Sequence, residues 1–180
     1  NVSLPEHVAL ARKVATSAVV LLKNNGILPI DVFRVKKIGV LGMAADAKPA
    51  WLDQSRGSGI LPQADCYSGG GSGHVQGISS TTATVLDALT ARGKELGVDI
   101  VSAQTTYNHN SSRNQWEKLQ EEVDFIIVVA STLTSEMHDR NNLQLDNEAD
   151  TLIAEVSQQK PTVVLMMLPG AILMPWRDEV

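Results

Sequence analysis

Residues 123–145 read VDFIIVVASTLTSEMHDRNNLQL, an apolar run that changes abruptly into a polar stretch at residue 131. A second apolar run, TVVLMML, covers residues 162–168. Strands that are apolar almost throughout are typical of a parallel sheet covered on both faces. The polar stretch 131–145 then lies at the carboxyl end of its strand, where open parallel sheets bind their ligands. We therefore place the candidate site there.

Helical and strand patterns alternate along the rest of the chain. In order, we expect a helix at 5–23, a strand at 37–42, a helix at 81–96, a strand at 98–101, a helix at 115–122, a strand at 123–130, a helix at 147–159 and a strand at 162–168. Thr81 or Thr82 is expected to cap the helix at 81–96. Polar residues 105–113 predict a loop. Right-handed crossovers then give an α/β fold in three layers: a doubly wound, mostly parallel sheet with helices on both faces.

The chain divides into two parts on this reasoning. Residues 1–30 form a leading helix and linker segment, and residues 31–180 form the α/β domain, which we expect to be truncated at its C-terminus. The strand at 37–42 lies near the centre of the sheet. Loops that follow the strands meet at one edge, so the glycine-rich loop 69–73 and the polar stretch 131–145 should lie together.

Composition excludes several classes of function. The net charge is −5 and no Lys/Arg cluster exceeds two adjacent residues, which argues against nucleic acid and anionic membranes as partners. No apolar run approaches the roughly 20 residues of a membrane span. The four histidines lack metal-ligand spacing and no phosphate-binding glycine motif is present, so we expect no metal and no cofactor. Sequons at Asn1 and Asn110 favour secretion.

Glu136 is the candidate catalytic residue. A carboxylate on a loop beside a cleft can be tuned by burial to donate a proton near neutral pH. His138 could do similar work. The alternative is a charged loop that only faces solvent. The single cysteine, Cys66, is either a nucleophile or an incidental thiol, and it cannot form an internal disulfide.

The irregular stretch 48–80 holds seven of the thirteen glycines. Glycines permit close approach of the backbone to a ligand, but a flexible surface loop has the same composition. We take Gly71 and Ser72 from this stretch as candidate substrate contacts, together with Trp51. Trp116 and Trp176 are expected to fill the core instead.

Five segments resemble the second domain of glycoside hydrolase family 3, the β-glucosidase and β-xylosidase family. They are 9–30 (ALARKVATSAVVLLKNNGILPI), 37–46 (KIGVLGMAAD), 69–75 (GGGSGHV), 136–145 (EMHDRNNLQL) and 162–176, with its LMPW ending. The segments run in the order of the family and span nearly the whole chain. The resemblance is specific because all five occur together.

The resemblance implies roles for three residues of the polar stretch. The family pairs a (β/α)8 barrel, which carries an aspartate nucleophile, with an α/β sandwich domain that in many members supplies the general acid/base glutamate. Glu136 matches that glutamate, and Asp139 and Arg140 match the pair that we interpret as loop scaffold. Met137 stands where the family usually has glycine, a residue that takes positive φ without strain.

The function implied is the C-terminal domain of a retaining β-glycosidase that hydrolyses O-glycosidic bonds of β-glucosides or related sugars. Its partners would be a carbohydrate substrate and a barrel domain. No segment resembles the nucleophile motif of the barrel, so we expect the isolated fragment to be inactive. The alternative is a non-catalytic α/β module that binds a carbohydrate or a partner. A nucleotide- or flavin-binding domain rests on topology alone.

Overall fold

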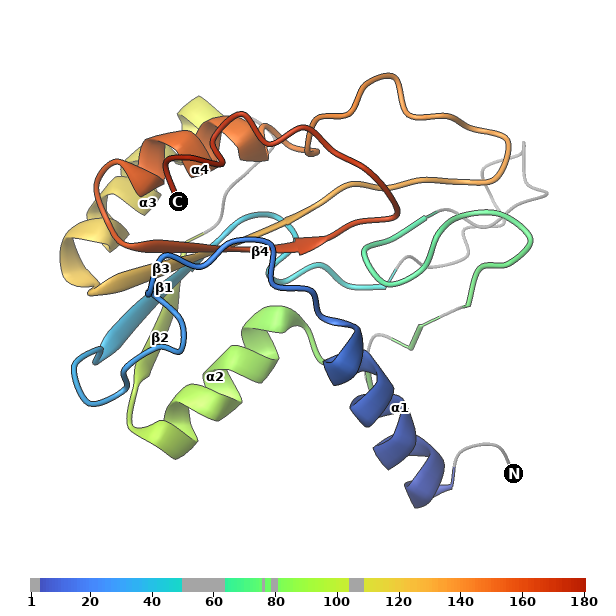
Figure 1. Ribbon diagram of the computed structural model, residues 1–180, viewed down its shortest axis with the longest axis horizontal. Coiled ribbons are helices and arrows are strands. Elements are labelled where there is room, and N and C mark those ends of the chain that lie inside the picture. The colour runs from blue at the N-terminus through green and yellow to red at the C-terminus, as the bar shows by residue number, and fades with distance from the viewer. Residues whose placement is uncertain (1–3, 50–63, 76, 79–80, 104–108) are drawn as a thin grey trace. The chain divides into compact units, whose positions relative to one another are not determined.

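The structure is a computed structural model that describes residues 4–49, 64–75, 77–78, 81–103 and 109–180. The chain forms two compact units, Asn1–Ile30 and Asp31–Val180. Helix α1 belongs to the first unit, and the sheet with helices α2, α3 and α4 belongs to the second (Figure 1). No helix among the described residues is both long enough and apolar enough to cross a membrane.

The first unit contains helix α1, Pro5–Ala18, with Pro5 in its first turn. The prediction that this helix reaches Lys23 is wrong, because Val19 is already extended (φ −69°, ψ 127°). Two β-branched residues, Val19 and Val20, stand at this point, and such side chains lose rotamer freedom in a helix. Gly26, at φ +98°, lies in a turn after this extended segment rather than directly after the helix.

The second unit is built on one parallel sheet. Its strands are β1 (Lys37–Leu41), β2 (Asp99–Ser102), β3 (Phe125–Ser131) and β4 (Thr162–Met167), in the order β2-β1-β3-β4. Gly39 pairs with Val101 on one side and with Ile126 on the other, so β1 is central as predicted. All seven residues of β3 are buried, which explains its continuous apolar sequence.

Helices cover both faces of the sheet, which confirms the predicted fold class. Helices α3 (His109–Glu122) and α4 (Ala149–Ser157) lie on one face, and α2 (Val85–Leu96) lies on the other (Figure 1). Two glycines allow close packing. A Cβ on Gly39 would lie 2.4 Å from Leu119 of α3, and one on Gly93 of α2 would lie 2.5 Å from Ile100.

The core lies between β1, β3 and the pair α3 and α4. Trp116 of α3 is fully buried and Trp176 is 3% exposed, which confirms the prediction that both fill the core. Their neighbours in this cluster are Leu41, Leu119, Val123, Ile126, Val128, Ala130, Leu145, Ala149, Leu152, Ile153 and Val156. The cluster reaches from the sheet to the base of the polar stretch, so the core and the candidate site share residues.

The starts of α2 and α3 differ most from the predictions, and α4 begins two residues later than expected. Helix α2 is capped by Thr84, whose hydroxyl accepts the N–H of Asp87 while the Asp87 carboxylate accepts the N–H of Thr84. This reciprocal pair is a capping box, and it starts the helix later than a cap at Thr81 or Thr82 would. Helix α3 begins at His109, so the predicted loop 105–113 is wrong from there on. Its first turn is polar and lacks the apolar period that marks a helix.

Asp124 links the start of β1 to the chain before β3 at the amino edge of the sheet. Its Oδ2 accepts the backbone N–H groups of Lys36 (2.8 Å) and Lys37 (3.0 Å), just where β1 begins. These two donors lower the pKa of the Asp124 carboxyl because they stabilise its ionised form. Lys37 also pairs with Glu122 at 2.9 Å. The strand predicted from residue 123 begins two residues later, at Phe125.

Candidate functional site

The polar stretch after β3 forms a loop whose two ends are hydrogen-bonded to each other. Asp146 donates its N–H to the Ser131 carbonyl (3.1 Å), and its Oδ2 accepts the Leu133 N–H (2.9 Å). Its Oδ1 lies 3.3 Å from the donating Thr132 hydroxyl. A compact surface loop with adjacent ends is an Ω-loop, a type that frequently carries function. We call residues 132–146 the site loop.

The segment after β4 holds the site loop from one side. Arg140 donates to the Ala171 carbonyl and, at 3.4 Å, to the Thr132 hydroxyl. The Leu173 N–H donates to the Leu143 carbonyl at 2.8 Å. The site loop is therefore joined to a segment that lies 31 residues beyond Arg140 in the sequence.

Asp150 adds a further connection at the end of the site loop. Its Oδ2 accepts the Leu145 N–H at 3.1 Å, and its Oδ1 accepts the indole N–H of Trp176 at 2.6 Å. Because Trp176 is buried, this carboxylate links the site loop to the core. Neither Asp146 nor Asp150 was predicted from the sequence to support the site. The available signal was their position directly after the polar stretch, before and within α4.

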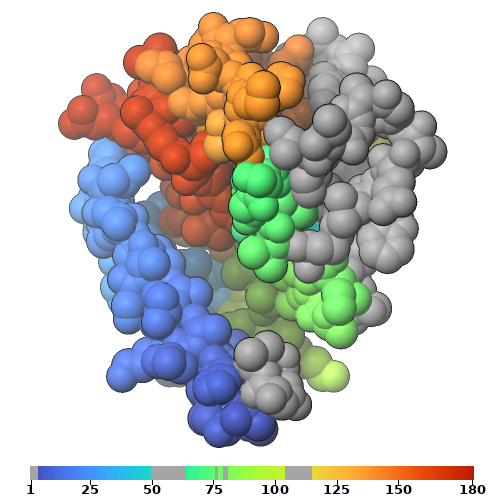
Figure 2. Space-filling view, turned by 90° about the vertical axis from the view of Figure 1, so that its right-hand side faces the viewer, coloured from blue at the N-terminus to red at the C-terminus, as the bar shows by residue number. Residues whose placement is uncertain are grey.

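The glycine-rich loop meets the site loop at the carboxyl edge of the sheet, as predicted. Gly70 donates its N–H to the Thr134 carbonyl (2.9 Å) and accepts the Glu136 N–H (3.1 Å). These bonds make a short parallel bridge between Gly70 and Ser135. Figure 2 shows the two loops side by side on one face.

Gly71 permits this contact. Its φ is +109°, and a Cβ there would lie 2.4 Å from Cβ of Glu136 and 2.7 Å from its Oε2. Residues other than glycine rarely adopt such a φ, and a Cβ cannot be accommodated this close to the atoms of Glu136. A glycine is therefore required here by both backbone conformation and space.

Glu136 receives two hydrogen bonds from a single residue. The N–H of Ser72 (2.7 Å) and its hydroxyl (2.6 Å) both donate to Oε2 of Glu136. Both donors favour the ionised carboxylate and lower its pKa, the side-chain bond being the larger cause. The expectation that burial tunes this carboxyl is wrong for this conformation, because Glu136 is exposed. Among the described residues, Oε1 has no hydrogen-bond partner.

Met137 follows Glu136 at the tip of the site loop. Its φ is 66°, the conformation that glycine takes most readily, and its side chain is 86% exposed. The turn is closed by the His138 N–H, which donates to the Ser135 carbonyl at 3.1 Å. A left-handed residue other than glycine costs about 1–2 kcal/mol. Met137 thus keeps a backbone shape suited to glycine at some cost in stability.

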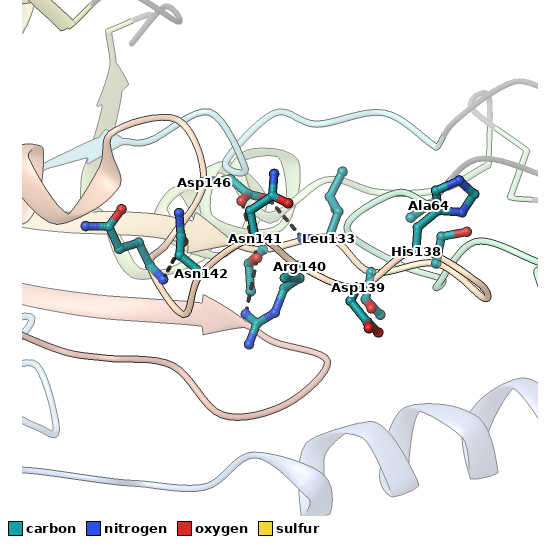
Figure 3. A pocket seen from close by; sticks show the side chains of 12 residues that line it. Ala64, Leu133, His138, Asp139, Arg140, Asn141, Asn142 and Asp146 are labelled. Atoms are coloured by element: carbon teal, nitrogen blue, oxygen red, sulfur yellow. Dashed lines mark hydrogen bonds between the residues drawn. The ribbon is translucent and has the colours of Figure 1, made fainter.

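A cavity of about 360 Å³ opens beside this tip (Figure 3). Its lining is mainly polar: Ala64, Thr132, Leu133, Thr134, Ser135, His138, Asp139, Arg140, Asn141, Asn142, Gln144 and Asp146. Glu136 is not among the lining residues, and its carboxyl is bonded to Ser72. Asp139 is exposed and has no hydrogen-bond partner in the described part of the chain, in contrast to Arg140. Trp51 lies outside the described residues.

The other candidate groups are chemically less suited to catalysis. Sγ of Cys66 lies 3.3 Å from the Ser131 hydroxyl, and burial raises the pKa of this thiol. A raised pKa leaves less thiolate, which is the nucleophilic form. Within the described residues, no three His, Cys, Asp or Glu side chains are grouped so as to hold a metal ion.

Comparisons with known proteins agree with this architecture. The profile of the Glycosyl hydrolase family 3 C-terminal domain matches residues 19–180. Probable beta-glucosidase L of Emericella nidulans is 30% identical over 96% of this chain and 23% of its own length. Thermostable beta-glucosidase B of Acetivibrio thermocellus is 27% identical over 97% of this chain and 22% of its own length.

Solved structures give the same result. A Glycoside Hydrolase Family 3 beta-glucosidase from Neurospora crassa superposes with a TM-score of 0.74 and 28% identity, over 97% of this chain and 21% of that one. Beta-D-glucoside glucohydrolase from Trichoderma reesei gives 0.67 and 26%, over 93% and 24%. The chain thus spans about a fifth to a quarter of the length of these proteins. On the match of residues 19–180, the chain belongs to the glycosyl hydrolase family 3 C-terminal domain family.

Proposed function

We propose that the chain is the C-terminal domain of a retaining β-glycosidase that acts on β-glucosides or related sugars, and that Glu136 is its general acid/base. The observation that carries the proposal is the place of Glu136 at the exposed tip of the site loop, with Oε1 free of described partners. Membership of the family and the names of the relatives, which are beta-glucosidases, support the substrate class.

The chemistry needs two protonation states of one carboxyl group. Protonated Glu136 gives its proton to the glycosidic oxygen, which takes the electron pair of the breaking bond while a carboxylate from another domain attacks the anomeric carbon. Ionised Glu136 then removes a proton from the water that hydrolyses the glycosyl intermediate. The bonds from Ser72 favour the ionised form, which is the state needed in the second half-reaction.

The nucleophile is proposed to come from a (β/α)8 barrel domain. The described residues of this chain hold an open four-stranded sheet, and the chain spans about a fifth of its curated relatives. We expect the 180-residue chain alone not to hydrolyse p-nitrophenyl β-glucoside at a useful rate. Addition of the barrel domain of the Neurospora crassa enzyme should restore hydrolysis, and activity of the chain alone would contradict the split catalytic pair.

The test of Glu136 uses two substrates with different needs for an acid. In the complex with the barrel, Glu136→Gln should lower kcat/KM for methyl β-glucoside by about 10²–10⁴-fold, a loss typical of a missing acid/base. The loss should be much smaller for 2,4-dinitrophenyl β-glucoside, whose leaving group departs without a proton.

A matched control and a rescue complete the test. Glu121→Gln changes an exposed carboxylate of α3 and should leave both rates unchanged. With Glu136→Ala, added azide should form a β-glycosyl azide, because azide needs no general base. Equal losses for both substrates, or full activity of Glu136→Gln, would refute the acid/base role.

A second candidate is a non-catalytic module that binds a carbohydrate or a partner. The polar cavity favours it, because Glu136 does not line this cavity and hydroxyl-rich ligands suit its amide and carboxylate groups. An NMR titration with cellobiose would detect such binding. Shifts at Asn141 and Asn142 that persist in Glu136→Gln, without activity in the barrel complex, would favour the binding module.

Secretion of the intact protein is also proposed, on the basis of its two sequons. One of them begins at Asn110, in the first turn of α3. Mass spectrometry of the protein from its natural source should find a glycan there, and an unmodified Asn110 would argue against use of this sequon.

A further inference from the structure

Ser72 approaches Glu136 with two donors rather than one. Its N–H and its hydroxyl lie 2.7 and 2.6 Å from the same oxygen, Oε2. Hydrogen bonds to an ionised group are short and strong, and both distances fall in that range. Oε1 receives no such bond from the described residues. The two oxygens of one carboxyl group are therefore in different environments.

The glycine-rich loop is braced in the conformation that aims Ser72 at Glu136. The Val75 N–H donates to the Ser68 hydroxyl at 2.9 Å, and Nδ1 of His74 lies 3.0 Å from the Gly69 carbonyl. Gly70 bonds to the site loop on both sides of Ser135. Ser72 thus sits on a loop fixed by bonds that do not involve its own side chain.

We propose that Ser72 is a positioning residue that holds Oε2 of Glu136 and so leaves Oε1 as the oxygen that exchanges the proton. The reason is the fixed polarity of the backbone donor. A hydroxyl can reverse its bond and accept a proton from a carboxylic acid, but an N–H cannot. While the Ser72 N–H is bonded to Oε2, protonation of that oxygen would weaken it as the acceptor of this N–H. The proton is therefore carried by Oε1.

This inference rests on the proposed function for its catalytic meaning but not for its measurement. In the isolated chain, ¹³C NMR of the Glu136 carboxyl carbon follows its titration directly, with Glu136→Gln identifying the signal. Ser72→Ala should move the midpoint upward, because loss of the hydroxyl donor destabilises the ionised form. Ser72→Thr keeps the hydroxyl and should titrate close to the unsubstituted chain.

Ser68→Ala is the matched control. It removes a hydroxyl that braces the same loop without touching Glu136. Its titration midpoint should move much less than that of Ser72→Ala, because both Ser72 donors remain and the Gly70 bonds still hold the loop. The titratable groups near Glu136, His138 and Asp139 on the site loop and His74 on the glycine-rich loop, are unchanged in all these variants. Unchanged titration in Ser72→Ala, or an equal shift in Ser68→Ala, would overturn the direct role of Ser72.

Two measurements on the barrel complex connect this result to catalysis. The basic limb of the kcat/KM profile should move to higher pH in Ser72→Ala, since the acid stays protonated longer, and return in Ser72→Thr. In a crystal with a bound thioglycoside, the sulfur should lie beside Oε1 with both Ser72 bonds intact, and broken Ser72 bonds would contradict the assignment. If Glu136→Gln were fully active, the proposed function would fail. The NMR titration would still test whether Ser72 acts directly on the Glu136 carboxyl.

Discussion

Substitution of Gly71 by alanine should detach the glycine-rich loop from the site loop. The new Cβ would lie 2.4 Å from Cβ of Glu136, whereas carbon atoms pack best at about 3.5–4.0 Å. The overlap cannot be relieved by a flexible side-chain end, because a Cβ is fixed to its backbone. One of the two loops must move away by about an ångström or more.

The expected loss in the free energy of unfolding can be worked out for each of two ways in which the loops could move. A residue other than glycine at φ +109° is strained by about 1–3 kcal/mol if the glycine-rich loop keeps its backbone conformation and the site loop moves. If the loop leaves instead, it loses the two backbone bonds of Gly70, each of which contributes about 0.5–1.5 kcal/mol. Either route lowers the free energy of unfolding by about 2 kcal/mol. At this domain size, that corresponds to a thermal midpoint lower by about 4–8 °C.

Gly73→Ala provides the control from the same loop. Its added Cβ would meet nothing within 4 Å, and its φ lies outside the left-handed region. Thermal melts of both variants should separate them clearly. Amide exchange adds a local measurement, in which the N–H groups of Gly70 and Glu136 lose protection only in Gly71→Ala. Similar melting and similar protection in the two variants would refute the steric reasoning.

Two further predictions concern the scaffold. Thr84→Ala should lower the free energy of unfolding by about 1 kcal/mol through loss of the capping box, whereas Thr81→Ala should change it by less than about 0.5 kcal/mol, and equal thermal midpoints would disprove the cap assignment. Asp124 has a lowered pKa in the folded state, so its contribution is complete above the ordinary aspartate pKa of about 3.9 and is lost as pH falls through the lower folded value. Urea midpoints of Asp124→Asn should therefore lie below those of the unsubstituted chain at neutral pH and converge with them in acid, and a difference independent of pH would exclude the carboxylate as its cause.

The architecture was predictable because burial leaves a direct mark on sequence. Residues 123–130 and 162–168 are apolar nearly throughout, and such runs belong to parallel strands covered on both faces. The start of α2 was also encoded, since Asp87 follows Thr84 by three residues. Thr81 and Thr82 obscured it, because any of the three can cap a helix by residue type alone.

The details of the site were less accessible. Ser72 and Glu136 are separated by 64 residues, and their bond depends on backbone angles at Gly71 and Met137. No local pattern reports that geometry. The direction of the pKa change at Glu136 could not be predicted for the same reason, because it depends on hydrogen-bond donors that another loop supplies. A family resemblance pointed to Glu136 as the candidate but did not describe its surroundings.

The anchoring of the site loop has a consequence for the order of events during synthesis. Arg140, Leu143 and Asp150 bind partners at 171, 173 and 176, which follow β4. Chains emerge from the ribosome amino end first. A nascent chain that has only just exposed Glu136 therefore lacks these anchors, even with the glycine-rich loop already available. The anchoring of the site loop that carries Glu136 is complete only after the segment beyond the fourth strand has been made and has docked.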